Sequence, residues 1–393
     1  MFLFPEAMAT YSVIKINRSS VFNSEMELCT AHYCFVTFLY SVKIRVILED
    51  IISIIVIAHD RKFYLKEAIK SLQFQSLDPR YSEVVIVKNF ELEETDELAK
   101  RLGYRLILTQ ARSAYEKLLI GFRNSTGSIV TFLEDDDKYI KERLNDIYVF
   151  FKTHKKVCYY HNDHSVISSD SRNFVPNNKK RRLENRFIII HNEPDSDVSL
   201  KNIFKIKKMR GDFNISSIAV RRHLLDEAIV KYGTSMFGGD RFLFLAALAS
   251  GCDIVLDRKP LTIYRVHPSN FSVPILLEGN LQDFIYKRLN FIEYQLSVVE
   301  QELSIFGEVF NGSHMQNYAY YESFMLKINF YILSQKTSAP KFFENLISLV
   351  RFQKLYDLRF LTEFLLLTVM SFLSNRASRY LYIVLFLKIR PKV

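Results

Sequence analysis

The chain of 393 residues is 49% hydrophobic and contains 33 Phe and 22 Tyr but only 11 Gly, a composition that excludes global disorder and collagen-like architectures. Its formal net charge of +10 favours an anionic partner, such as a nucleotide, an acidic lipid surface or a nucleic acid, without choosing among them. The four cysteines have no metal-ligand spacing. We therefore expect them to be buried small hydrophobic residues of a protein in a reducing compartment, the cytoplasm.

Residues 1–48 lack a clean hydrophobic period of either 2 or 3.6, and they carry no basic segment typical of a secretory signal. The apolar run at 33–41 is much shorter than the roughly 20 residues that a spanning helix needs. We interpret residues 1–48 as an N-terminal extension without regular structure, upstream of the folded domain.

Strands and helices alternate from residue 52 onward. The expected strands are 52–58, 84–87, 104–108 and 129–133, and the expected helices between them are 62–75, 94–101 and 113–122. The strands are rich in β-branched residues and show no polar alternation, which is typical of strands buried on both faces of a parallel sheet. This order predicts a Rossmann-like α/β fold with a mixed, mainly parallel sheet flanked by helices.

The second half of this domain is less regular. The expected order is a helix at 139–153, a strand at 157–161, an irregular insertion at 168–200, a strand at 213–220, helices at 222–231 and 241–250, and strands at 253–256 and 261–266. His161 and His164 have no third ligand nearby, and we interpret them as polar loop residues. The chain then becomes a helical C-terminal region, which predicts a division into 1–48, 49–275 and 276–393.

The strongest local signal for chemistry is the run Glu134-Asp135-Asp136-Asp137, which follows directly after an apolar strand. Ligands of open α/β sheets bind at the carboxyl ends of the strands, so these acids should face the binding crevice. Four adjacent anions repel one another, and Mg²⁺ or Mn²⁺ bound to a diphosphate would compensate them. The alternative is that the acids cap the next helix, although one acid suffices for that role.

Several ordered motifs between about residues 52 and 270 resemble the family 2 glycosyltransferases of the GT-A fold. They are Ser53-Ile54-Ile55-Val56-Ile57-Ala58-His59-Asp60-Arg61, Gly121-Phe122, Gly127, Phe132-Leu133-Glu134-Asp135-Asp136-Asp137, Asp240 after Gly238-Gly239, and Tyr264-Arg265-Val266-His267-Pro268-Ser269-Asn270. The resemblance implies a GT-A fold, a nucleotide-sugar donor, an inverting transfer to a hydroxyl acceptor and a divalent metal.

The resemblance also implies a role for each matching residue. The nucleotide-sugar donor would contact Ala58, His59, Asp60, Asn89, Glu134 and Asp135, and the metal would bind Asp136, Asp137 and, as a weaker candidate, His267. Arg265 would face the diphosphate. Asn89 stands where the family often has an aspartate that contacts the base, and this departure leaves the identity of the base undetermined.

Asp240 is implied to be the general base, because an inverting transfer needs a carboxylate that accepts the proton of the acceptor hydroxyl. Gly239 precedes it where the family usually has a second acid. Without the resemblance, an aspartate at this position would be interpreted as an ordinary helix N-cap.

Three other functions remain as alternatives. A metal-dependent nucleotidyltransferase would also use acids, but the turn at 59–62 lacks the glycines of a phosphate loop. A catalytically decayed scaffolding homologue at the membrane surface would explain Gly239. Nucleic-acid binding rests on net charge alone, without a stacking motif, and is not expected.

The C-terminal region has a basic tail, since residues 336–393 carry ten Lys or Arg and three acids. Two interpretations stay open for its apolar helical stripes. They pack on the catalytic domain, or they lie peripherally on the cytoplasmic face of a membrane, with the basic charge against anionic headgroups and a glycan or lipid-linked acceptor nearby.

Overall fold

The computed structural model describes residues 14–16, 46–59, 62–172, 174–175, 186–192, 202–203, 206, 210–234, 239–267, 270 and 281–334. Asp60, most of the expected N-terminal extension and the basic tail lie outside these residues, and so do the predictions that depend on them.

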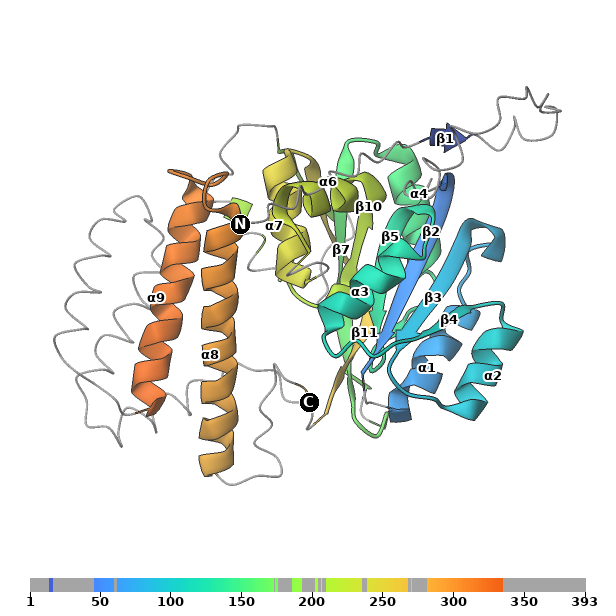
Figure 1. Cartoon of the computed structure of the whole chain (residues 1–393), viewed down its shortest axis with the longest axis horizontal. Helices are drawn as coiled ribbons and strands as arrows, with labels where there is room; N and C mark the ends of the chain where they lie inside the picture. The colour runs from blue at the N-terminus through green and yellow to red at the C-terminus, as the bar shows by residue number, and fades with distance from the viewer. Residues whose placement is uncertain are drawn as a thin grey trace, which may run out of the picture.

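The described strands form one mixed sheet with the order β4-β3-β2-β5-β10-β7-β11-β6 along its main path (Figure 1). Its strands are β1 (Ile14–Ile16), β2 (Val46–Ala58), β3 (Ser82–Lys88), β4 (Arg105–Leu108), β5 (Gly127–Glu134), β6 (Lys138–Tyr139), β7 (Val157–Ser168), β8 (Phe174–Val175), β9 (Phe187–Ile190), β10 (Ile218–Arg221) and β11 (Asp253–Val266). Strands β4, β3, β2 and β5 are parallel to one another, whereas β10 is antiparallel to both β5 and β7. The expected mixed, mainly parallel sheet is therefore confirmed.

Helices cover both faces of this sheet (Figure 1). They are α1 (Lys62–Gln73), α2 (Glu93–Arg101), α3 (Ala114–Arg123), α4 (Arg143–Thr153), α6 (Arg222–Tyr232) and α7 (Asp240–Ser250). Successive residues of β2 enter different cores, since Ile55 packs with the residues of α3, α6 and α7, and Ile54 packs with those of α1 and α4. Side chains alternate across a strand, which explains why β2 is apolar at every position from Ile54 to Ala58.

Helix α3 lies very close to the sheet at Gly121. A Cβ atom at this position would overlap the side chain of Ile55 on β2. Only glycine allows so close an approach of helix backbone to strand. This contact sets the distance between α3 and β2.

The helical C-terminal region begins with two long helices, α8 (Leu281–Phe306) and α9 (His314–Ser334), which lie side by side next to α7 (Figure 1). Phe306 anchors them, because its ring lies 5.8 Å from that of Phe242 and 4.4 Å from that of Tyr232. Within the described part of the chain, no helix combines the length and the apolar character needed to cross a membrane.

Strand β7 differs from the expectation that it would end near residue 161. It continues to Ser168 because β11 pairs with it in parallel over almost its whole length. His161 and His164 therefore belong to a strand, and their interpretation as loop residues was wrong. The imidazole of His161 is buried, with Nε2 lying 2.8 Å from the carbonyl oxygen of Phe213.

Other strand boundaries also differ from the expected ones. The expected strands at 253–256 and 261–266 form one strand, β11, with register shifts around Pro260. The expected strand at 213–220 begins with a 3-10 turn, η4 (Ile215–Ser217), before β10. Strand β2 begins at Val46 and pairs with β1, so part of the expected extension belongs to the sheet.

The structure also corrects the expectation that the cysteines are simply buried small hydrophobic residues. Cys158 on β7 and Cys252 just before β11 form a disulfide, with Cα atoms 5.8 Å apart. They are 94 residues apart in sequence, and only the pairing of β7 with β11 brings them together. Spacing along the chain therefore did not reveal the pair.

Candidate functional site

The candidate site is a cavity of about 790 Å³ at the carboxyl ends of β2 and β5. Its walls come from α3, the loop before β10, the start of α7, and helices α8 and α9. Glu134, Asp136 and Asp240 all line it, so the sheet brings together residues that lie more than 100 positions apart in sequence. Cavities of this size hold small molecules.

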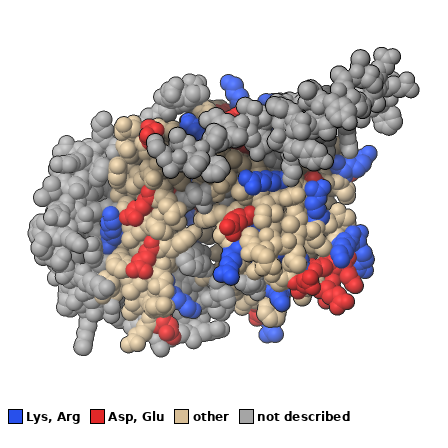
Figure 2. Space-filling view, viewed as in Figure 1, with Lys and Arg blue, Asp and Glu red and all other residues tan. Residues whose placement is uncertain are grey.

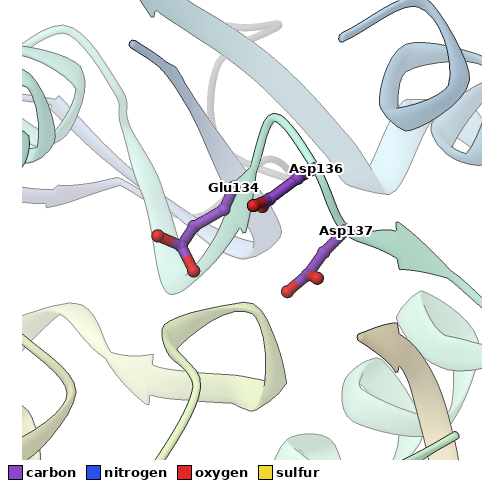
Figure 3. Close-up of side chains that lie close together, drawn as sticks. All are labelled: Glu134, Asp136 and Asp137. Carbon is purple, nitrogen blue, oxygen red and sulfur yellow. The ribbon is translucent and has the colours of Figure 1, made fainter. Parts of the chain in front are cut away.

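Three carboxylates gather where β5 ends. Glu134, Asp136 and Asp137 can offer ligand oxygens that all lie within 4.8 Å of one another, and Figure 3 shows their side chains projecting from the strand end and the turn that follows it. The turn is fixed on one side by the backbone N–H of Glu134, which donates to Ser216 Oγ at 3.1 Å.

Asp137 shows that these acids suit a cation. It is buried, and its Oδ2 has no hydrogen-bond partner in the structure. Burial and the neighbouring negative charge of Asp136 raise the pKa of Asp137 to about 8. A buried carboxyl oxygen without a donor is costly, and a divalent cation would satisfy it. The acidic cluster therefore fits a hard cation bound by oxygen ligands.

Asp135 serves a different purpose from its neighbours. Its Oδ2 accepts a hydrogen bond of 2.9 Å from the backbone N–H of His59, which follows β2. This contact joins the turn after β2 to the turn after β5. Asp135 thus holds these two turns together and is not a member of the acidic cluster.

His267 lies against the cluster from the end of β11. Its Nε2 is 2.9 Å from Asp136 Oδ2, both side chains are buried, and its ring lies 5.3 Å from that of Tyr64. Arg265, in contrast, bonds to Glu67 at 2.9 Å and to the backbone oxygen of Asp136, and its side chain is fully buried. The expectation that Arg265 faces the diphosphate was wrong, because its guanidinium bonds to Glu67 and to the backbone of the acidic turn.

Lys117 of α3 is a site residue that the sequence did not reveal. Its ammonium group donates to the backbone oxygen of Ala58 at 2.9 Å and to Asn89 Oδ1 at 3.0 Å, and it lies 2.6 Å from His59 Nδ1. The side chain is fully buried. One lysine thus connects three residues that the family resemblance assigns to the donor pocket. The available signal was a lysine between apolar residues of the expected helix 113–122.

Replacing Lys117 with methionine should lower the free energy of unfolding by about 1–3 kcal/mol, because the oxygens of Ala58 and Asn89 lose a buried donor. Nucleoside diphosphate affinity should also fall. Chemical denaturation and calorimetry measure the two effects. Lys66→Met is the matched control, since Lys66 pairs with an exposed Glu94 and should change stability much less. Equal behaviour of both variants would contradict the role of Lys117.

Asp240 is the first residue of α7, and Gly239 occupies the N-cap position. The carboxylate accepts from the backbone N–H of Asn214 at 3.1 Å and from that of Arg241 at 2.9 Å. Burial, together with the charge of Asp212, raises the pKa of Asp240 to about 6. Such a carboxylate is largely ionised at neutral pH yet basic enough to accept a proton.

Comparison with known proteins agrees with this geometry. Residues 53–213 match the family described as glycosyl transferase family 2. This range begins within β2, ends just before η4 and includes the whole acidic cluster. No curated protein matches the sequence significantly.

Among solved structures, the chain is similar to TarS of S. aureus, residues 1–349. The complex with UDP has 14% sequence identity and a TM-score of 0.44, and the alignment covers 74% of this chain and 76% of that one. The complex with UDP-GlcNAc has 14% identity and a TM-score of 0.47, with 77% and 80% covered.

Proposed function

We propose that this chain, whose residues 53–213 match glycosyl transferase family 2, is an inverting glycosyltransferase that uses a divalent metal and a nucleotide-sugar donor. The observation that carries the proposal is the shared cavity, which is lined by Glu134 and Asp136 of the acidic cluster and by Asp240. A metal site and a carboxylate of raised pKa in one cavity are what an inverting transfer to a hydroxyl group requires.

In this mechanism Asp240 accepts the proton of the acceptor hydroxyl while that oxygen attacks the anomeric carbon from the face opposite the leaving group. The bond from the anomeric carbon to the diphosphate oxygen breaks, and its electron pair leaves with the nucleoside diphosphate. Glu134, Asp136 and Asp137 would hold Mn²⁺ or Mg²⁺, and His267 contacts Asp136 through Nε2. Such an ion compensates the charge of the diphosphate.

The donor's nucleoside would occupy the region around Ala58, His59 and Asn89, which Lys117 and Asp135 hold in place. We propose residues 49–275 as the catalytic domain and 276–393 as a helical region that closes the cavity. Attachment of its tail to an anionic membrane surface, on the cytoplasmic side, remains a prediction.

Thermal shift measurements with a panel of nucleotide sugars, each with and without Mn²⁺, test the proposal. At least one nucleotide sugar should raise the midpoint of unfolding, and Mn²⁺ should increase that shift. Release of nucleoside diphosphate from the same donor distinguishes an active enzyme from a decayed homologue, which would bind without turnover. A shift by nucleoside triphosphates alone would favour a nucleotidyltransferase and would contradict the proposal.

A further inference from the structure

Helices α8 and α9 supply a large part of the cavity wall. The residues they contribute are Phe291, Tyr294, Gln295, Val298, Val299, Tyr318, Glu322, Met325, Leu326 and Asn329. The same cavity continues to Asp240 and the acidic cluster. We refer to this set of α8 and α9 residues as the hairpin wall.

The hairpin wall is fixed to the candidate general base. Arg241, the residue after Asp240, donates to Glu302 of α8 at 2.6 and 2.7 Å and to Glu322 of α9 at 2.9 Å. Glu302 is buried, and a buried carboxylate in a bidentate pair with a guanidinium has one defined geometry. The wall therefore keeps a fixed position relative to Asp240, and whatever it binds is held next to the base.

The charges around the cavity disfavour an anionic acceptor. Its described lining contains five carboxylates, those of Glu134, Asp136, Asp212, Asp240 and Glu322, and one guanidinium, that of Arg241, which is already bonded to Glu302 and Glu322. A further cation, Arg210, stacks 3.7 Å from the ring of Phe213 and does not line the cavity. A metal would compensate the acids at the β5 end only, so a phosphate or uronate near Asp240 would meet like charge.

The hairpin wall is also unsuited to a bare hydrocarbon chain. Tyr294, Gln295 and Asn329 place hydroxyl and amide groups among its apolar side chains, and Glu322 adds a carboxylate. The hydroxyl of Tyr294, the amide nitrogen of Asn329 and the carboxylate of Glu322 already have partners within the protein. Covering the remaining hydrogen-bonding capacity of these groups and of Gln295 with hydrocarbon removes it from water without offering new hydrogen bonds, which costs free energy. Aromatic rings next to amides and hydroxyls suit a molecule with apolar faces and hydroxyl edges, as in a pyranose ring.

From these observations we infer that the hairpin wall is the acceptor subsite and that it binds an uncharged saccharide. The inference rests on the proposed function and narrows its acceptor to a neutral glycan whose ring packs against Phe291 or Tyr294. The hydroxyl of Tyr294 lies 3.0 Å from that of Tyr115 on α3, so the two tyrosines bridge the hairpin and the catalytic domain at the cavity lining.

The test uses the full chain and the donor that gives the strongest Mn²⁺-dependent thermal shift. Nucleoside diphosphate release is measured with neutral gluco- and manno-oligosaccharides, with oligogalacturonates of matched length and with a polyprenyl phosphate sugar. Neutral oligosaccharides should stimulate release above donor hydrolysis, and oligogalacturonates should not. Stimulation by oligogalacturonates, or only by the polyprenyl-linked sugar, would overturn the inference.

Two variants test the position of the subsite. Tyr294→Ala and Gln295→Ala should raise the KM for the neutral acceptor about tenfold, the loss expected for one stacking or hydrogen-bonding contact, and should raise it more than the KM for the donor. Tyr286→Ala is the matched control, because Tyr286 lies on the same helix but is 67% exposed and does not line the cavity. The hairpin wall is not the acceptor subsite if the Tyr294 and Tyr286 variants have the same acceptor KM. Absence of any donor binding or hydrolysis would instead refute the proposed function, and the inference with it.

Discussion

Replacing Asp240 with asparagine is expected to lower transfer by ~10²-fold or more while the affinity for the nucleotide donor stays close to that of the unmodified chain. Asparagine has nearly the same shape and still accepts hydrogen bonds through Oδ1, so the contacts with the N–H groups of Asn214 and Arg241 can be partly kept. What it loses is the ability to take a proton from the acceptor hydroxyl.

Steady-state transfer and calorimetric donor binding measure the two quantities separately. Asp78→Asn is the control, since Asp78 is an exposed carboxylate paired only with its neighbour Arg80. If the Asp240 variant keeps transfer but loses donor affinity, Asp240 contacts the donor or caps α7, and the base must be another residue.

The pH profile gives an independent test of the same assignment. A general base must be deprotonated to act, and the pKa of Asp240 is raised to about 6, mainly by burial. Transfer should therefore rise with pH through about 6 and level off above it. Asp212 contributes to this raised pKa through its negative charge, so Asp212→Asn should move the rising limb to lower pH. A limb that does not move would mean that another group titrates.

The sequence predicted the half of the fold whose contacts are local. Strand β2, helix α1 and strand β3 are visible because a βαβ unit pairs neighbouring segments and buries each strand on both faces. The paired length of β7 and β11 was missed, because it depends on contacts between segments that lie about 100 residues apart. The same pairing explains the missed disulfide and the misinterpreted His161.

The candidate site shows the same division. The acids from Glu134 to Asp137 were recognisable because they are adjacent in sequence. The sequence did not show that Asp135 accepts from the N–H of His59 while its neighbours form the cluster. Lys117 and Arg241 were missed, because a single lysine or arginine on a helix usually lies at the surface. Their importance follows from what other elements place against them, which no local pattern of residues encodes.

Changing Asp136 to alanine is expected to abolish the Mn²⁺-dependent part of nucleoside diphosphate binding. The variant removes one of the three carboxylates of the acidic cluster and also the contact that holds His267. A diphosphate next to the remaining acids would then lack its compensating ion. Calorimetry with and without Mn²⁺ measures the effect, and an unchanged Mn²⁺-dependent affinity would contradict the metal assignment.

Asp135→Ala is the informative comparison, because it removes an adjacent carboxylate that lies outside the cluster. It should weaken nucleotide binding about equally with and without Mn²⁺, since it disturbs the contact with the N–H of His59 and not the metal ligands.

The acidic cluster should also be visible in the stability of the metal-free protein. The pKa of Asp137 is about 8 in the folded state, well above its ordinary value of 3.8, so between these values the folded state binds more protons than the unfolded state. The free energy of unfolding should therefore fall as pH rises across that interval. Mn²⁺ should stabilise the protein increasingly toward pH 8, because a cation takes the place of the proton.

In Asp136→Ala the neighbouring charge is gone, so the pKa of Asp137 should drop and both pH dependences should become shallower. Thermal unfolding from pH 5 to 8.5, with and without Mn²⁺, measures them, and the same slopes in both proteins would mean that Asp136 and Asp137 do not share a cation.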